Sequence, residues 1–163
     1  MHYLIDGYNG LFRTPKSKLS LEEKRRWFIQ HIDNLVKNRS CLVTIVFDSS
    51  DPSRDLYSRG HFGSLEIIFT PKRQTADECI ETLVEQAKRP SHITVVTMDR
   101  QLREKCMLRG ACVLNIEQFV DHFQKKQKTT RSNASSSKPL WQESSSQVNR
   151  LLAIFEKKLS DDA

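Results

Sequence analysis

Continuous runs of apolar residues alternate along the chain with segments in which apolar residues recur every three or four positions. The continuous runs predict strands buried on both faces, and they lie at 2–5, 41–47, 65–69, 93–97 and 111–114. The periodic segments between and after them predict helices that bury one face. This alternation predicts an α/β fold with a mostly parallel central sheet of about five strands and helices on both faces.

Two of the expected helices carry a signal at their first residue. Ser20 is followed by Glu23, and Thr75 by Glu78, and each pair matches a capping box. Residues 48–64 contain no helix signal, so the connection between the second and third expected strands is irregular, or its direction is open.

The composition of the chain changes after residue 123. Residues 124–146 are rich in Ser, Lys, Gln and Thr, which predicts a flexible linker. Residues 147–160 carry apolar residues at helical spacing and predict a short amphipathic helix, which docks on the domain or binds a partner. We therefore expect a domain at 1–123, a linker at 124–146 and a terminal helix at 147–160.

The net charge is +6 at pH 7, and most of the positive excess lies after residue 123. Such a charge is compatible with a polyanionic partner but does not establish one. No apolar run approaches the length of a membrane span, and no basic segment leads into an apolar core at the start. The four cysteines form no CxxC pair, so we expect buried, reduced thiols in a cytoplasmic protein.

Acidic residues occur where three of the expected strands end and where one helix begins. Asp6, Asp48 and Asp99 follow strands, and Asp77 lies in the first turn of the helix that starts after Thr75. Each has a simple structural explanation as a helix cap, a turn residue or a partner of the helix dipole. The carboxyl ends of parallel strands, however, share one edge of a sheet, so the sequence predicts that the four carboxylates converge there.

Converging carboxylates repel one another unless they are protonated or neutralised by a cation. A set of hard oxygen ligands without histidine or cysteine favours Mg²⁺ or Mn²⁺ over Zn²⁺. An ion of this kind would bind a phosphate oxygen and lower the pKa of a bound water. An ion held by a few carboxylates is the usual arrangement for phosphoryl chemistry.

Four motifs in a fixed order carry a resemblance to a known family. They are DGYN at 6–9, VFD at 46–48, TAD at 75–77 and VTMDR at 96–100. In this order they resemble the YacP-like bacterial branch of the NYN-domain nucleases, within the wider PIN-like group. The resemblance covers about residues 1–123, and the tail lies outside it.

The resemblance implies a PIN-like three-layer fold whose first strand is central, between the second and the fourth. It also implies a metal-dependent endoribonuclease that cuts single-stranded RNA, with a link to messenger RNA on the ribosome. Asp6, Asp77 and Asp99 look like the core metal ligands, and Asp48 like an outer one. Asn9 is expected to orient the first ligand or a bound water.

One departure from the family pattern keeps a second function open. Met98 stands where the family more often has a small hydroxyl residue before the aspartate, so a hydrogen bond is expected to be lost there. The alternative is a catalytically weak or inactive module that binds RNA or the ribosome. Replacing Asp99 by Asn distinguishes the two hypotheses. The substitution should abolish cleavage by a nuclease, whereas it should leave RNA binding by an inactive module intact.

Basic residues on the segments expected at the same edge are candidates for contacts with RNA phosphates. They are Arg13, Lys16, Arg54, Arg59, Lys72, Arg73, Arg100 and Arg103. Tyr57 and Phe62 are candidates for stacking on unpaired bases, whereas we expect Tyr8 to be packed.

Overall fold

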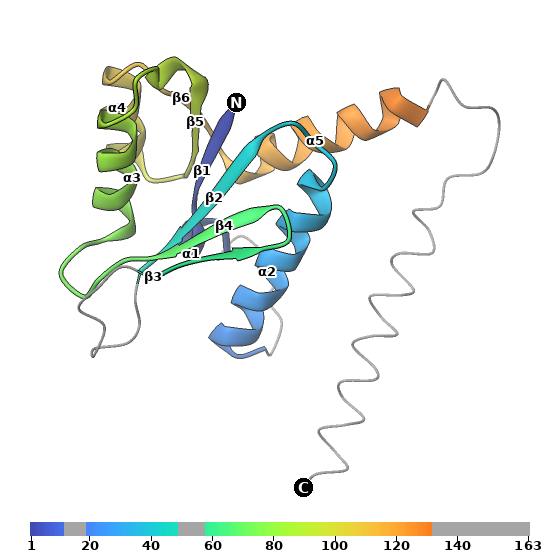
Figure 1. Ribbon diagram of the computed structural model, residues 1–163, viewed down its shortest axis with the longest axis horizontal. Helices are drawn as coiled ribbons and strands as arrows, with labels where there is room; N and C mark the ends of the chain where they lie inside the picture. Colours follow the sequence, from blue (N-terminus) through green and yellow to red (C-terminus); the bar gives the residue numbers. More distant parts are fainter. Residues whose placement is uncertain (12–18, 49–57, 132–163) are drawn as a thin grey trace, which may run out of the picture. The chain divides into compact units, whose positions relative to one another are not determined.

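The apolar runs form the parallel strands of a single sheet. In the computed structural model, which describes residues 1–11, 19–48 and 58–131, these strands are β1 (His2–Asp6), β2 (Leu42–Phe47), β4 (Leu65–Phe69), β5 (Ile93–Val96) and β6 (Cys112–Leu114). The spatial order of the whole sheet is β3-β4-β2-β1-β5-β6 (Figure 1). The first strand is therefore central, between β2 and β5, as the family resemblance implies.

A sixth strand, β3 (Ser58–Phe62), is a strand that the sequence pattern did not predict. It pairs antiparallel with β4 through a tight turn, in which Gly63 has a φ of 56°. The carboxylate of Asp33 accepts the Ser64 N–H at 2.7 Å and so holds this turn. Because β3 is an exposed edge strand, it lacks the apolar run that marks the inner strands.

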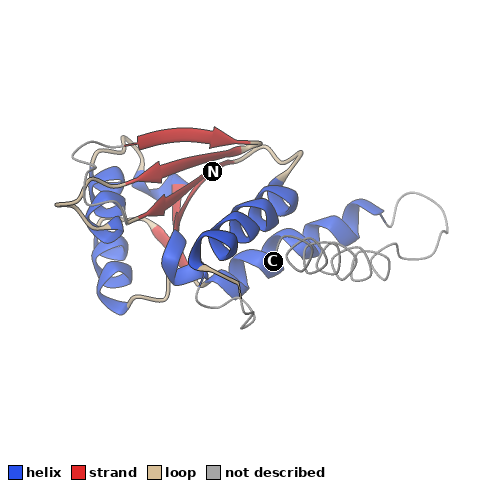
Figure 2. Cartoon of the chain, turned by 90° about the horizontal axis from the view of Figure 1, so that it is seen from below, coloured by secondary structure: helices blue, strands red, loops and turns tan. Residues whose placement is uncertain are grey.

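Helices cover both faces of the sheet and complete the three layers (Figures 1 and 2). The helices α2 (Leu21–Val36) and α5 (Ile116–Arg131) pack on one face, where Phe28, Ile32 and Phe119 join the core. The helices α3 (Ala76–Glu85) and α4 (Arg100–Leu108) cover the other face, through Ile80, Leu102 and neighbouring residues.

Local hydrogen bonds explain where α2 and α3 begin. Ser20 and Thr75 each accept a hydrogen bond from the backbone N–H three residues on. The side chains of Glu23 and Glu78 in turn accept hydrogen bonds from the backbone N–H groups of Ser20 and Thr75. Both predicted capping boxes are therefore confirmed. The helix α3 ends at Glu85, earlier than the periodicity suggests, and a short 3₁₀ turn, η1 (Pro90–His92), leads into β5.

A short helix, α1 (Gly7–Leu11), follows β1 directly, where the sequence suggested only a break at the glycines. A Cβ atom on Gly7 would clash with the ring of Phe47. The missing side chain therefore lets the first turn of α1 approach the end of β2. This close approach brings α1 to the carboxyl edge of the sheet.

The chain divides into two units, Met1–Lys128 and Thr129–Ala163, and α5 runs through the boundary. The helix extends to Arg131, so the first residues of the segment predicted as a linker, from residue 124, are helical. Glutamine and lysine favour helices, which agrees with the continuation of α5 into this segment. The terminal helix predicted at 147–160 lies outside the described residues.

Two findings bear on the class of protein expected from composition. Among the described helices, none combines the length and the apolar character that a membrane span requires. Of the four cysteines, Cys79 and Cys106 are buried, Cys41 is partly buried and Cys112 is exposed, so the expectation of buried thiols is correct for only two.

Candidate active site

The carboxyl ends of the parallel strands place four aspartates at one edge of the sheet. Asp6 is the last residue of β1, Asp48 follows β2, and Asp99 lies between β5 and α4. Asp77 is the second residue of α3 and completes the group. These residues come from four separate segments of the sequence, and the register of the strands brings them together.

Asp6 is the most buried of the four, with 8% of its surface exposed. Its Oδ1 accepts the Asn9 N–H at 3.2 Å, and its Oδ2 accepts the Thr97 hydroxyl at 3.4 Å. Burial raises the pKa of Asp6 to about 6 against the lowering effect of the Asn9 hydrogen bond, and the negative charges of Asp77 and Asp48 add to the increase. Asp6 is therefore a carboxyl group that a nearby cation would help to ionise.

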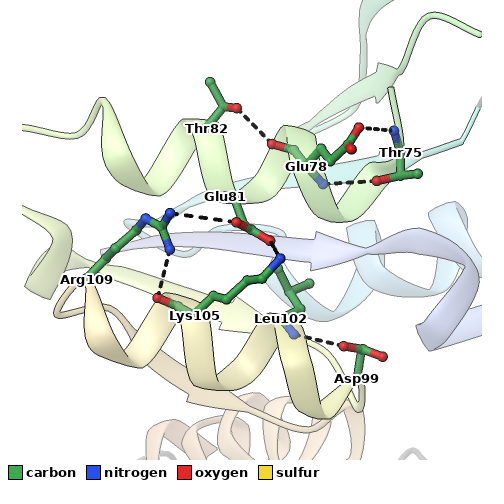
Figure 3. A network of polar contacts seen from close by, with 8 residues as sticks. All are labelled: Thr75, Glu78, Glu81, Thr82, Asp99, Leu102, Lys105 and Arg109. Atoms are coloured by element: carbon green, nitrogen blue, oxygen red, sulfur yellow. Dashed lines mark hydrogen bonds and ion pairs between the residues drawn. The ribbon is translucent and has the colours of Figure 1, made fainter. Parts of the chain in front are cut away.

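Asp48 and Asp99 each bind the start of a helix. Asp48 Oδ1 accepts the N–H of Ala76, the first residue of α3, at 2.6 Å. Asp99 is the N-cap of α4 and accepts the Leu102 N–H at 2.8 Å (Figure 3). The structural explanation of Asp99 as a cap is thus correct, and the free N–H groups of two helices fix where both carboxylates lie.

Asp77 differs because its carboxylate makes no hydrogen bond to a described residue. Burial raises its pKa, and the negative charges of Asp99 and Asp48 raise it further. Glu81, one helical turn later, acts in the same direction, and Lys105 opposes it. An ionised carboxylate without a hydrogen bond, beside other carboxylates, is the position in this group with most to gain from a cation.

Asn9 ties two loops of this edge together. Its backbone N–H donates to Asp6, and its side-chain Oδ1 accepts the Met98 N–H at 2.8 Å. The asparagine therefore holds the start of α1 against the loop between β5 and α4. This contact accounts for an asparagine at the position that the resemblance singled out, although it acts on the protein backbone.

Thr97 is a site residue that the sequence analysis missed. It is 1% exposed, and its hydroxyl both donates to Asp6 Oδ2 and accepts the Asp99 N–H at 3.1 Å. The hydroxyl that binds Asp6 and the Asp99 N–H is thus that of Thr97, one residue before Met98, whose own backbone N–H donates to Asn9. A threonine two positions before an aspartate at a strand end was the available signal, since such a hydroxyl often binds the backbone two residues on.

We expect Thr97→Val to destabilise the fold by about 1–3 kcal/mol, because the variant removes the hydrogen bonds that the Thr97 hydroxyl makes to Asp6 Oδ2 and to the Asp99 N–H. The measurement is denaturant unfolding of the metal-free protein. Thr82→Val is the control, since the Thr82 hydroxyl donates to the Glu78 carbonyl on an exposed helix surface and its loss should cost less than about 0.5 kcal/mol. Equal stabilities of the two variants would contradict this role for Thr97.

Whether these residues suit a divalent ion depends on their donor atoms and their spacing. The donors are carboxylate oxygens, which are the ligands that Mg²⁺ and Mn²⁺ prefer. A neutral oxygen is also present near the ends of β2 and β4: the Thr70 N–H donates to the Phe47 carbonyl, and the buried Thr70 hydroxyl has no hydrogen-bond partner among the described residues. In the described part of the chain, however, no three His, Cys, Asp or Glu side chains are grouped so that they could hold one ion. The donor chemistry fits the ion, and metal binding would require a shift of these carboxylates.

The basic residues predicted to bind RNA fall into three sets. Arg13, Lys16 and Arg54 lie outside the described residues. Lys72 and Arg73 are exposed in the turn between β4 and α3, at the edge that carries the aspartates. The other three belong to β3 or α4, and two of them are paired: Arg59 lies 3.7 Å from Glu66, and Arg100 lies 2.9 Å from Glu104, whereas Arg103 is partly buried.

The predictions for aromatic residues had different outcomes. Tyr8 is packed, as expected: its ring meets Phe47 edge to face, and its hydroxyl accepts a hydrogen bond from Arg25 at 2.6 Å. Phe62 is exposed, but it pairs with Leu65 at the amino end of β4. Because β3 is antiparallel, Phe62 lies at the opposite end of the sheet from the aspartates, and its predicted role in stacking at the site was wrong. Tyr57 lies outside the described residues.

Comparison with known proteins identifies the family of the chain and solved structures with a similar fold. The sequence model of the YacP-like NYN domain matches residues 3–161, so the family similarity extends beyond the residues 1–123 to which the motifs had limited it. The fold is similar to a crystal structure of Rae1 (YacP) from Bacillus subtilis, with 22% identity and a TM-score of 0.61 over 99% of this chain and 96% of that chain. It is also similar to a tryptophan-to-leucine mutant of Rae1, with 24% identity and a TM-score of 0.60 over 88% and 89% of the two chains. No curated protein matches the sequence.

Proposed function

Because the chain belongs to the YacP-like NYN domain family, which indicates a nuclease-type role related to RNA, we propose that it is a metal-dependent endoribonuclease acting on single-stranded RNA. The observation that carries this proposal is the meeting of Asp6, Asp77 and Asp99 at one edge of the sheet, where burial and mutual repulsion raise the pKa of Asp6 and Asp77. Such groups are typical of sites built for a charged ligand.

In this proposal Asp6, Asp77 and Asp99 hold Mg²⁺ or Mn²⁺, with Asp48 as an outer ligand. The bound ion supplies a Lewis acid for a phosphate oxygen and lowers the pKa of a water. Thr97 and Asn9 keep Asp6 in place through hydrogen bonds, and the first turns of α3 and α4 keep Asp48 and Asp99 in place. Lys72, Arg73, Arg100 and Arg103 are proposed to bind the phosphates beside the scissile one.

The proposed substrate is messenger RNA, including messenger RNA on the ribosome, and the proposed compartment is the cytoplasm. The support for this finer assignment is the family resemblance together with the net charge of +6. The alternative is a module that binds RNA or the ribosome without cutting. The position of the aspartates at one edge of the sheet favours the nuclease, since a binding module gains nothing from carboxylates that repel a phosphate backbone.

We expect an end-labelled single-stranded RNA to be cut in the presence of Mn²⁺ or Mg²⁺ and to remain intact in EDTA. Asp99→Asn should lose cleavage and keep its fold, because asparagine caps a helix about as well as aspartate. The assay compares both proteins on free RNA and on translating ribosomes, with RNA binding measured in parallel. Binding without cleavage by the wild type in every condition would contradict the nuclease and support the binding module.

A further inference from the structure

Glu81 lies on α3, one helical turn beyond Asp77, and the proposed chemistry does not use it. Its carboxylate meets Lys105 of α4 and Arg109, the C-cap residue of that helix. Lys105 Nζ lies 2.6 Å from Oε1, and Arg109 Nη2 lies 3.7 Å from Oε2. Only 16% of the Glu81 side chain is exposed, whereas the Lys105 side chain is 52% exposed. Figure 3 shows the glutamate pointing from α3 to α4, with the two basic side chains reaching it from consecutive turns.

A backbone contact completes the connection between the helices. Arg109 Nη1 donates to the Lys105 carbonyl at 3.2 Å, so the guanidinium binds both Glu81 and the last turn of α4 (Figure 3). Lys105 and Arg109 are four residues apart and share one face of the helix. One partly buried carboxylate thus joins α3 to two turns of α4, and we call this group the α3–α4 clamp (Glu81, Lys105 and Arg109).

The clamp matters because each of the two helices carries one of the aspartates near its first residue. Asp77 is the second residue of α3, and Asp99 is the N-cap of α4. Both helices begin on the same side in Figure 3, so a tilt or slide of one against the other would change the separation of Asp77 and Asp99. The clamp is thus a polar connection between α3 and α4, in addition to the apolar contacts of the core.

We propose that Glu81 is a positioning residue, which sets the separation of Asp77 and Asp99 through Lys105 and Arg109 and does not itself bind the ion. This inference rests on the proposed function, since it concerns the affinity of the same site for Mn²⁺. The alternatives make different predictions. If Glu81 is a metal ligand restrained by Lys105, removing Lys105 should strengthen metal binding. If Lys105 and Arg109 are contacts for RNA, Glu81→Gln should leave metal binding unchanged and strengthen RNA binding.

The test is isothermal titration with Mn²⁺, using Glu81→Gln, Lys105→Met, Lys105→Arg and the double variant Glu81→Gln/Lys105→Met. We expect each of the first two to weaken Mn²⁺ binding about tenfold, the loss typical when a residue that supports metal ligands is removed. Lys105→Arg should keep near wild-type affinity because it keeps the ion pair. The double variant should be no weaker than the worse single variant, because both substitutions break the same contact.

The control is Glu22→Gln, which breaks an exposed ion pair between Glu22 and Arg26 within α2, at 3.5 Å and away from the site. Thermal unfolding of each variant checks that the fold is intact, and Lys105→Met keeps the test decisive if Glu81→Gln does not fold. Tighter or unchanged Mn²⁺ binding by Lys105→Met would overturn the inference. A wild-type protein that neither binds Mn²⁺ nor cuts RNA would overturn the proposed function as well. If the wild type binds Mn²⁺ and cuts RNA, but Glu81→Gln binds Mn²⁺ with the same affinity, only the role of the clamp is overturned.

Discussion

Asp77→Asn will lose RNA cleavage by about a thousandfold or more and will be at least as stable as the wild type. The loss of activity follows from removing one of the charged groups that hold the ion, which is the scale of effect seen when a major electrostatic contributor is deleted. The gain in stability follows from the raised pKa of Asp77, because the ionised group is less favourable in the folded protein than in the unfolded chain. Asparagine has nearly the same shape and avoids this cost.

The measurement pairs single-turnover cleavage in Mn²⁺ with thermal unfolding of the metal-free protein. The control is Glu78→Gln on the same turn, because glutamine also completes the capping box with Thr75 and should keep both activity and stability. A structural role for Asp77 would appear as loss of the cooperative unfolding transition in Asp77→Asn. Full cleavage by that variant would remove Asp77 from the site.

The second large effect is a dependence of stability on pH that is specific to Asp6. In the unfolded chain this carboxyl loses its proton near pH 4, but in the folded protein it does so only at about pH 6. The folded state therefore holds more protons between these values, and the free energy of unfolding falls as the pH rises through this range. At about 1.4 kcal/mol per pKa unit, the loss is on the order of 3 kcal/mol by pH 7.

We expect metal-free Asp6→Asn to be more stable than the wild type at pH 7 by on the order of 2–3 kcal/mol, and equally stable near pH 4. Asparagine can still accept the Asn9 N–H, and its amide can donate to the Thr97 hydroxyl. Denaturant unfolding of both proteins at several pH values between 4 and 7 gives the difference directly. A difference that does not change with pH would show that Asp6 has an ordinary pKa.

A divalent ion should offset the loss of stability that ionisation of Asp6 causes at pH 7. Mn²⁺ at pH 7 should raise the melting temperature of the wild type, since a ligand that binds only the folded state stabilises it by mass action. The ion should have little effect on Asp6→Asn, because that variant lacks the buried carboxylate whose charge the ion neutralises. This comparison also separates metal binding from any effect of Mn²⁺ on the rest of the protein.

The features that could be predicted from the sequence are those that depend on neighbouring residues. The capping boxes at Ser20 and Thr75 close over three residues, and the buried strands are continuous apolar runs. The positions of Asp6, Asp48, Asp77 and Asp99 at one edge also followed, because parallel strands all end there. The exposed strand β3 escaped prediction, since it lacks an apolar run and is held by pairing with β4.

By itself, the sequence determined the order of the buried strands and helices, the family resemblance and the edge on which the aspartates lie, because each of these follows from local patterns and the direction of parallel strands. Only the tertiary structure decided what each carboxylate contacts. Asp48 binds a backbone N–H that is 28 residues away, Thr97 reaches Asp6 over 91 residues, and Glu81 meets Lys105 over 24. Such contacts depend on how helices pack on the sheet and on one another, and no pattern of neighbouring residues specifies that packing.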